Sequence, residues 1–126
     1  MIVLDTHAFL WFASAPDRLG REATRAIRRA PRLGVCAITC FEFATLVARG
    51  RVTVDRSPLD WLEHALGLPH VELLSLTPAV GVRASQLVAL EDPADRIIVA
   101  TALLESAPLV THDERIRDSG LLPTIW

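Results

Sequence analysis

Four acidic side chains stand near predicted helix starts in this 126-residue sequence: Asp5, Glu42, Asp95 and Asp113. Each lies at or just inside the junction between an apolar, strand-like run and the beginning of a helix pattern. Carboxylates that lie close together raise each other's pKa unless a cation neutralises them. Hard oxygen ligands, without a set of thiolates or imidazoles, favour Mg²⁺ or Mn²⁺ over zinc. If the fold brings the four together, they support metal-dependent hydrolysis, in which a bound ion activates water for a phosphodiester displacement.

The same acids also have a simpler explanation as helix caps. Acids near a helix N-terminus are favoured by the macrodipole and by capping alone. Three segments fit capping patterns, namely Thr39 to Glu42, Asp92 to Asp95 and Thr111 to Glu114. Asp5 can likewise cap a helix that begins near His7. Taken singly, each acid is explained more readily by capping than by metal binding, so the arrangement of the elements has to decide.

Strands are predicted to alternate with helices along the chain. Short apolar runs of strand type occur at Ile2 to Leu4, Gly34 to Ile38, Val71 to Leu76, Ala107 to Thr111 and, at the end, Pro123 to Trp126. Helical periodicity occurs at about 7 to 14, 20 to 30, 39 to 49, 58 to 66, 78 to 89 and 93 to 106. This alternation is typical of an α/β domain with a mostly parallel sheet. In such a sheet the strand ends that lead into helices share one edge, where ligands bind, so the four acids are expected to converge there.

The length and composition predict one globular domain, residues 1 to 126, without a repeat, a linker or a low-complexity tract. No apolar run approaches the ~18 residues that a membrane span needs, so no membrane association is expected. The start of the chain lacks the basic and apolar regions of a secretory signal, which predicts a cytoplasmic, reducing setting. Cys36 and Cys40 are predicted to be small buried hydrophobes, because two thiols cannot complete a tetrahedral zinc site.

All 13 basic residues are arginine, and the absence of lysine excludes any mechanism that needs a catalytic lysine. Four of them share one face of the predicted helix 20 to 30: Arg21, Arg25, Arg28 and Arg29. This face is either simply solvated or a stripe that contacts phosphates, since arginine presents a rigid fork of donors. The net charge of -2 argues against strong non-specific binding to a nucleic-acid duplex.

Four segments resemble, in their order and spacing, the PIN-domain ribonucleases of the VapC toxin class. The segments are Val3 to His7, Ile38 to Glu42, Asp92 to Ala102 and Leu109 to Ile116, and the resemblance spans nearly the whole chain. It implies a single three-layer α/β/α domain and Mg²⁺-dependent cleavage of RNA, with Mn²⁺ as an alternative ion. It also implies a toxin of a type II toxin–antitoxin pair, restrained by a cognate antitoxin. A homodimer is expected from the family alone.

The resemblance also implies a role for each acid. Asp5 and Asp95 are expected to be the main metal ligands. Glu42 and Asp113 are expected to complete the cluster, either directly or through water. Asp92 is predicted to be a helix cap.

Four further residues near the acids have open roles. Thr111 could contribute a hydroxyl contact, orient a water or cap a helix. Arg96 could contact phosphate or the antitoxin, or form an ion pair with a neighbouring acid. His7 and His112 flank two of the acids and are expected to support the site or the fold rather than to act as a base or a ligand.

Two departures from the family pattern bear on substrate binding. Members of the class often carry a histidine and a basic or small residue where this chain has Leu90 and Glu91, which makes the substrate side less predictable. An inactive PIN-like module that binds RNA or protein therefore stays open as an alternative, although retention of all four acids argues against it. A phosphorylation receiver is disfavoured, because the paired acids after the first strand and the late lysine of that pattern are absent.

Two adjacent aromatic residues, Trp11 and Phe12, lie in the first predicted helix. Both cannot face the core from one helix, so one is expected to contribute to an exposed partner surface. In the resembling family that region helps to bind the antitoxin.

Overall fold

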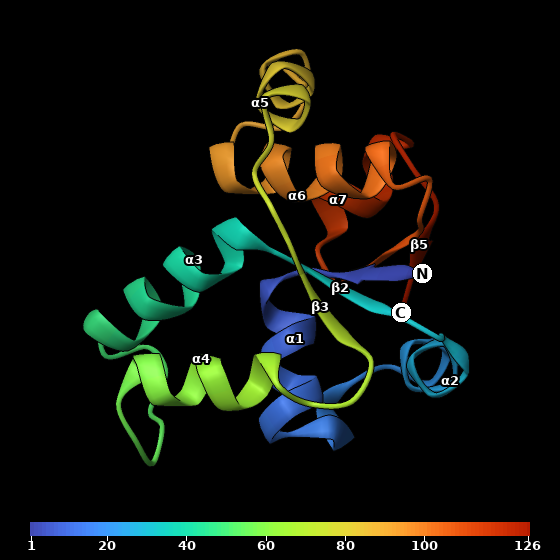
Figure 1. Ribbon diagram of the computed structural model, residues 1–126. Helices are drawn as coiled ribbons and strands as arrows, with labels where there is room; N and C mark the ends of the chain where they lie inside the picture. Colours follow the sequence, from blue (N-terminus) through green and yellow to red (C-terminus); the bar gives the residue numbers. More distant parts are fainter.

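A computed structural model describes all residues, 1–126, and shows five parallel strands between layers of helices (Figure 1). The strands are β1 (Ile2–Leu4), β2 (Leu33–Cys36), β3 (Val71–Leu74), β4 (Leu109–Val110) and β5 (Thr124–Ile125). Their order in the sheet is β3-β2-β1-β4-β5, and every neighbouring pair is parallel. The predicted α/β class with a mostly parallel sheet is confirmed.

Seven α-helices and one 3₁₀ turn connect the strands. They are α1 (Thr6–Ser14), the turn η1 (Pro16–Arg18), α2 (Arg21–Arg29), α3 (Ala37–Ala48), α4 (Pro58–Leu66), α5 (Pro78–Ser85), α6 (Pro93–Leu104) and α7 (Glu114–Ser119). In Figure 1, α5, α6 and α7 lie above the sheet, and α1, α2 and α4 lie below it. None of these helices is long and apolar enough to cross a membrane.

Two hydrophobic cores fill the space on the two faces of the sheet. Val3 packs into the core shared with α5, α6 and α7, whereas its neighbours Ile2 and Leu4 pack into the core shared with α1 to α4. This alternation follows from the two-residue period of a strand. In the second core the Phe43 ring stacks on Trp61, with ring centroids 4.3 Å apart. Both faces of the sheet are therefore covered, as an all-parallel sheet requires.

Local sequence sets most helix boundaries. Asp92 caps a helix whose first turn begins with a proline, as the sequence predicts, and Ser57 and Thr77 cap two other helices in the same way. Gly50 follows the end of α3: this residue has a φ of +71°, and its amide donates to the Val47 carbonyl at 3.0 Å. Only glycine adopts such a left-handed conformation without strain, so the helix ends there.

Several predicted boundaries are wrong. The strand predicted to reach Ile38 ends at Cys36, and α3 begins at Ala37, so Thr39 lies inside the helix and does not cap it. The helix predicted over 78 to 89 ends at Ser85. A helix start was predicted near Asp113, but the extent of α7 was not, because its 6 residues are too few to show a helical period.

The order of the strands creates a switch point beside β1. The chain runs from β1 outward through β2 to β3 and then returns to place β4 on the other side of β1. In open parallel sheets, ligands bind in the crevice at the carboxyl ends of the strands where the order reverses. Asp5 follows β1 directly, and Asp113 lies shortly after β4, so both stand at this crevice.

Candidate active site

All four predicted acids line one pocket of about 460 Å³ at this edge of the sheet. Asp92 adds a fifth carboxylate to the lining. The remaining polar and aromatic lining residues are Thr6, His7, Trp11, His112 and Arg115. The structure therefore brings together acids that are separated by up to 108 positions in the chain, from Asp5 to Asp113.

Asp5 and Asp113 are both helix caps and pocket residues. Asp5 accepts a hydrogen bond from the Ala8 amide at 2.8 Å and begins α1, as predicted. Asp113 begins α7 by accepting from the amides of Arg115 at 2.8 Å and Ile116 at 3.3 Å. Both bonds of Asp113 use Oδ1, which leaves Oδ2 free for another partner. Capping fixes the orientation of these carboxylates, so the capping and site explanations are compatible.

Glu42 does not cap a helix and is held by two buried threonines. The Thr6 hydroxyl donates to Glu42 Oε1 at 2.5 Å, and the Oγ1 atoms of Thr6 and Thr39 lie 3.0 Å apart. A hydroxyl has a single proton, so Thr39 must donate to Thr6 while Thr6 donates to Glu42. This chain of hydroxyls ties α3 to the turn after β1. It was not predicted from the sequence, although Thr6 directly follows Asp5 and Thr39 precedes Glu42 by three residues on one helix face.

Asp95 reaches the pocket by a different route from the one predicted. Helix α5 and a loop lie between β3 and α6, so Asp95 does not follow a strand. It lies in the first turn of α6, whose N-terminus points to the same edge of the sheet. Asp92 caps this helix by accepting from the Ala94 amide at 2.8 Å, which confirms its predicted role as a cap.

Burial and mutual repulsion make the pocket a costly place for so many negative charges. Burial raises the pKa of Asp95 to about 7, and the nearby charges of Asp92 and Asp113 contribute to this rise. Burial also raises the pKa of Asp5, and a hydrogen bond from the Thr111 side chain partly offsets this rise. Burial raises the pKa of Glu42 as well. A cation in the pocket would reverse these shifts by stabilising the ionised carboxylates.

Thr111 contributes a hydroxyl contact but does not cap a helix. Its side chain is fully buried, and its Oγ1 accepts from the Asp113 amide at 3.0 Å. Asp113 itself is the cap of α7, so the capping alternative for Thr111 is wrong. Thr111 thus holds the backbone of Asp113 while its side chain lies beside Asp5.

The predicted ion pair of Arg96 is wrong. Its Nε donates to the Leu90 carbonyl, and its guanidinium makes no ion pair with any acid. The physical reason is that adjacent residues on a helix point in different directions, so Arg96 turns away from Asp95. Arg96 instead anchors the loop that leads into Asp92, and it does not line the pocket.

Arg115 and Trp11 line the pocket, although the sequence patterns did not assign them to the site. Arg115 is exposed, lines the acidic pocket and forms no ion pair. Trp11 is partly buried and lies 5.7 Å from the His7 ring and 5.7 Å from the Trp126 ring, measured between centroids. Phe12 is also partly buried, so both aromatic residues keep some exposed surface, and the partner surface expected of one of them stays a prediction. The signal for Arg115 was its place in the first turn after Asp113.

A model of the PIN domain family matches residues 2–120. The chain belongs to the PIN domain family. This PIN domain is 38% identical over 118 residues to Ribonuclease VapC22 of Mycobacterium tuberculosis, an alignment that covers 92% of this chain and 89% of the relative. The predicted resemblance to the VapC class is confirmed.

Solved structures share the fold of this PIN domain at low sequence identity. VapBC2 from Rickettsia felis, bound to a DNA fragment from its promoter, superimposes with a TM-score of 0.72 at 14% identity, over 98% of this chain and 97% of that chain. A toxin–antitoxin complex from Klebsiella pneumoniae gives a TM-score of 0.62 at 20% identity, over 90% of this chain and 87% of that chain. These likenesses establish the three-layer fold of this PIN domain.

The donor set of the PIN domain pocket fits a hard divalent cation. No three acidic, histidine or cysteine side chains converge closely enough to hold an ion as they stand. The pocket nevertheless offers carboxylate and hydroxyl oxygens, the ligands that Mg²⁺ and Mn²⁺ prefer. The Cys36 thiol lies in the core and does not line the pocket, and burial raises its pKa to about 12. The predicted role of a small buried hydrophobe is confirmed for Cys36, whereas Cys40 is only partly buried.

Proposed function

We propose that this PIN domain is a metal-dependent endoribonuclease and the toxin of a type II toxin–antitoxin pair. The observation that carries the proposal is the convergence of Asp5, Glu42, Asp95 and Asp113 on one pocket. Identity of 38% to a ribonuclease along nearly the whole chain supports the same chemistry. A scaffold that only binds RNA or protein would have no use for a cluster of carboxylates that raise each other's pKa.

Asp5 and Asp95 are the main metal ligands in this proposal, and Glu42 and Asp113 complete the site directly or through water. Mg²⁺, or Mn²⁺ in its place, supplies an activated water and charge stabilisation for phosphodiester hydrolysis when bound. The donor oxygens that the protein leaves available support these assignments. For example, Asp113 uses only Oδ1 in capping α7.

Neighbouring residues position these acids and the substrate. Thr39 and Thr6 hold the Glu42 carboxylate through their chain of hydroxyls, and Thr111 holds the Asp113 backbone. The unpaired guanidinium of Arg115 can bind a non-bridging phosphate oxygen, because arginine forms strong charge-assisted hydrogen bonds with phosphate. Arg115 would thus offset the repulsion between the acidic pocket and the RNA backbone.

The partners of this toxin are RNA, a cognate antitoxin and a second copy of the chain. The fold shared with a toxin–antitoxin complex supports the antitoxin. A surface between α3 and α6 supports protein contacts near the site, because Phe41 is 69% exposed there beside Ile38 and Ile97. The cytoplasm, where RNA and a newly made antitoxin both occur, is the setting in which these partners meet.

A fluorogenic RNA cleavage assay with Mg²⁺ tests the proposed activity. Wild type should cleave RNA only when the metal is present, and Asp5→Asn and Asp95→Asn should each lose most of the activity. Asp60→Asn is a matched control, because Asp60 also follows a cap and a proline in the first turn of a helix but lies outside the acidic pocket. Activity without metal, or activity untouched by both site changes, would show that the pocket is not a nuclease site. RNA binding without cleavage would favour the inactive binding module.

A further inference from the structure

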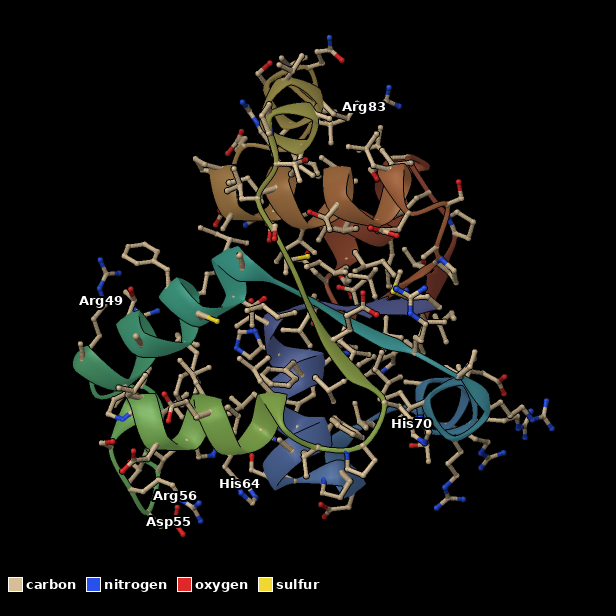
Figure 2. All side chains as sticks on the ribbon, in the orientation of Figure 1. Arg49, Asp55, Arg56, His64, His70 and Arg83 are labelled. Atoms are coloured by element: carbon tan, nitrogen blue, oxygen red, sulfur yellow. The ribbon has the colours of Figure 1, made fainter.

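A second cavity of about 550 Å³ adjoins the acidic pocket, and Trp11 lines both. The second cavity lies between the end of α1, the connection from α3 to α4, and α4 itself. We call it the arginine pocket, because Arg18, Arg51 and Arg56 line it together with His64. Figure 2 shows Arg56 at the tip of the α3–α4 connection and His64 on the outer side of α4. The two cavities have opposite charge and share one wall.

The arginine pocket has an excess of unpaired positive charge. Arg56 forms an ion pair with Asp55, with Nε and Oδ1 3.1 Å apart. Arg18 and Arg51 form no ion pair and no side-chain hydrogen bond in the protein. Two guanidinium groups therefore keep all their hydrogen-bond donors available, whereas Arg56 is paired with Asp55, which also lines this pocket.

Trp11 holds the Arg18 guanidinium in place. The guanidinium carbon of Arg18 lies 4.8 Å from the centroid of the Trp11 ring, a cation–π contact. Trp11 is itself fixed by the Trp126 ring and by packing against the core on its side of the sheet. The donors of a guanidinium lie along the edge of its plane, so stacking on a ring leaves them free to bind a phosphate. Arg18 is thus oriented in advance for an anion.

We infer that the arginine pocket binds a backbone phosphate of the RNA strand next to the phosphate held at the acids. This inference rests on the proposed ribonuclease function. RNA has a phosphate at every nucleotide, and those flanking the cleaved bond are repelled by five carboxylates, so they need cationic contacts nearby. The strand would cross Trp11 between the two cavities, and a base can stack on such an aromatic ring.

Other arginines near the acids are less suited to this role. Arg49 lines a different cavity next to the acids, where it is the one arginine on a largely apolar surface with Phe41 and Ile97. Arg115 lies within the acidic pocket itself and is placed to meet the phosphate held there. Only the arginine pocket combines several guanidinium groups with a ring shared with the acidic pocket.

The direct test measures binding of a fluorescent single-stranded oligoribonucleotide by anisotropy, in the Asp95→Asn background so that the RNA stays intact. Arg18→Ala and Arg51→Ala should each weaken binding about tenfold, the usual effect of removing a charged hydrogen bond. The slope of log Kd against log salt should fall by about 0.7 for each phosphate that no longer binds a guanidinium. Arg83→Ala is the matched control, because Arg83 is exposed on α5 at the opposite end of the molecule from Arg56 (Figure 2). It should bind RNA within about twofold of the parent.

Cleavage kinetics provide the second readout and separate this inference from the proposed function. With Asp95 restored, Arg18→Ala and Arg51→Ala should raise KM about tenfold and leave kcat nearly unchanged, because the contact is remote from the reacting bond. The inference is overturned if both variants bind and cleave RNA like Arg83→Ala, and equally if they lose only their affinity for the antitoxin. If wild type binds RNA through Arg18 and Arg51 but never cleaves it, the ribonuclease proposal fails and the arginine pocket stands.

Discussion

Replacing Asp95 with asparagine should stabilise the metal-free protein while abolishing its activity. Asp95 lies in the first turn of α6 among the other acids of the pocket, where burial, together with the charge of Asp92, raises its pKa from 3.8 to about 7. Folding without a metal therefore places a carboxylate where its charge is unfavourable. Asparagine has nearly the same shape and no charge, so Asp95→Asn removes this cost.

The direction of the pH dependence follows from the raised pKa. Below pH 3.8 the carboxyl is protonated in both the folded and the unfolded chain, and its charge costs nothing. As the pH rises towards about 7, the unfolded chain releases the proton while the folded protein retains it, so stability falls. Above about pH 7 the folded protein carries the charge, and the full cost is present.

The expected magnitude follows from the same shift. A pKa difference between 3.8 and about 7 corresponds to roughly 4 kcal/mol for a fully shielded carboxyl. Asp95 is partly exposed, and solvent screening reduces the expected gain to about 1–2 kcal/mol. For a chain of this size, that gain raises the melting temperature by roughly 4–8 °C.

Thermal melts in EDTA between pH 4 and pH 8 measure the effect. The advantage of Asp95→Asn over wild type should be small at pH 4 and reach its full value at pH 8. Adding Mg²⁺ at pH 8 should then raise the melting temperature of wild type more than that of the variant, because the ion binds the folded site. Asp60→Asn, the same change at the same helical position outside the pocket, should show no such pH-dependent gain. A metal-free Asp95→Asn protein that melts below wild type at pH 8 would refute the argument.

Three other substitutions test separate parts of the structure. Thr39→Val removes the hydroxyl that donates to Thr6, so it should lower kcat and weaken Mg²⁺ binding several-fold, as measured by calorimetry. Thr39→Ser should restore both. Unchanged metal affinity in Thr39→Val would contradict a positioning role for this hydroxyl. Arg115→Ala should raise KM for RNA about tenfold, whereas Arg117→Ala on the same helix should not. Equal effects of the two changes would mean that only the net positive charge of the helix matters. Phe43→Ala should lower the free energy of unfolding in urea by about 3–5 kcal/mol, because the ring is 1% exposed and stacks on Trp61. A decrease of less than about 1 kcal/mol would mean that the core relaxes to fill the cavity.

Local interactions explain why much of the fold could be predicted. The alternation of apolar runs and helical periods predicts the parallel α/β sheet, and caps such as Asp92 and stops such as Gly50 act over only a few residues. Boundaries failed where packing decided them. For example, α3 begins at Ala37, and this places Thr39 inside the helix against Thr6 instead of at a cap.

The sequence by itself determined the identity of the acids, their places near helix starts and the resemblance to the PIN domain family, because these depend on residue type and short-range spacing. Only the tertiary structure decided which side chains meet. It brings Asp95 to the pocket on α6 without a preceding strand, turns Arg96 away towards Leu90 and places Arg18 over Trp11. The physical reason is that the direction of a side chain depends on how its helix packs against distant elements, and no local pattern of residues specifies that packing.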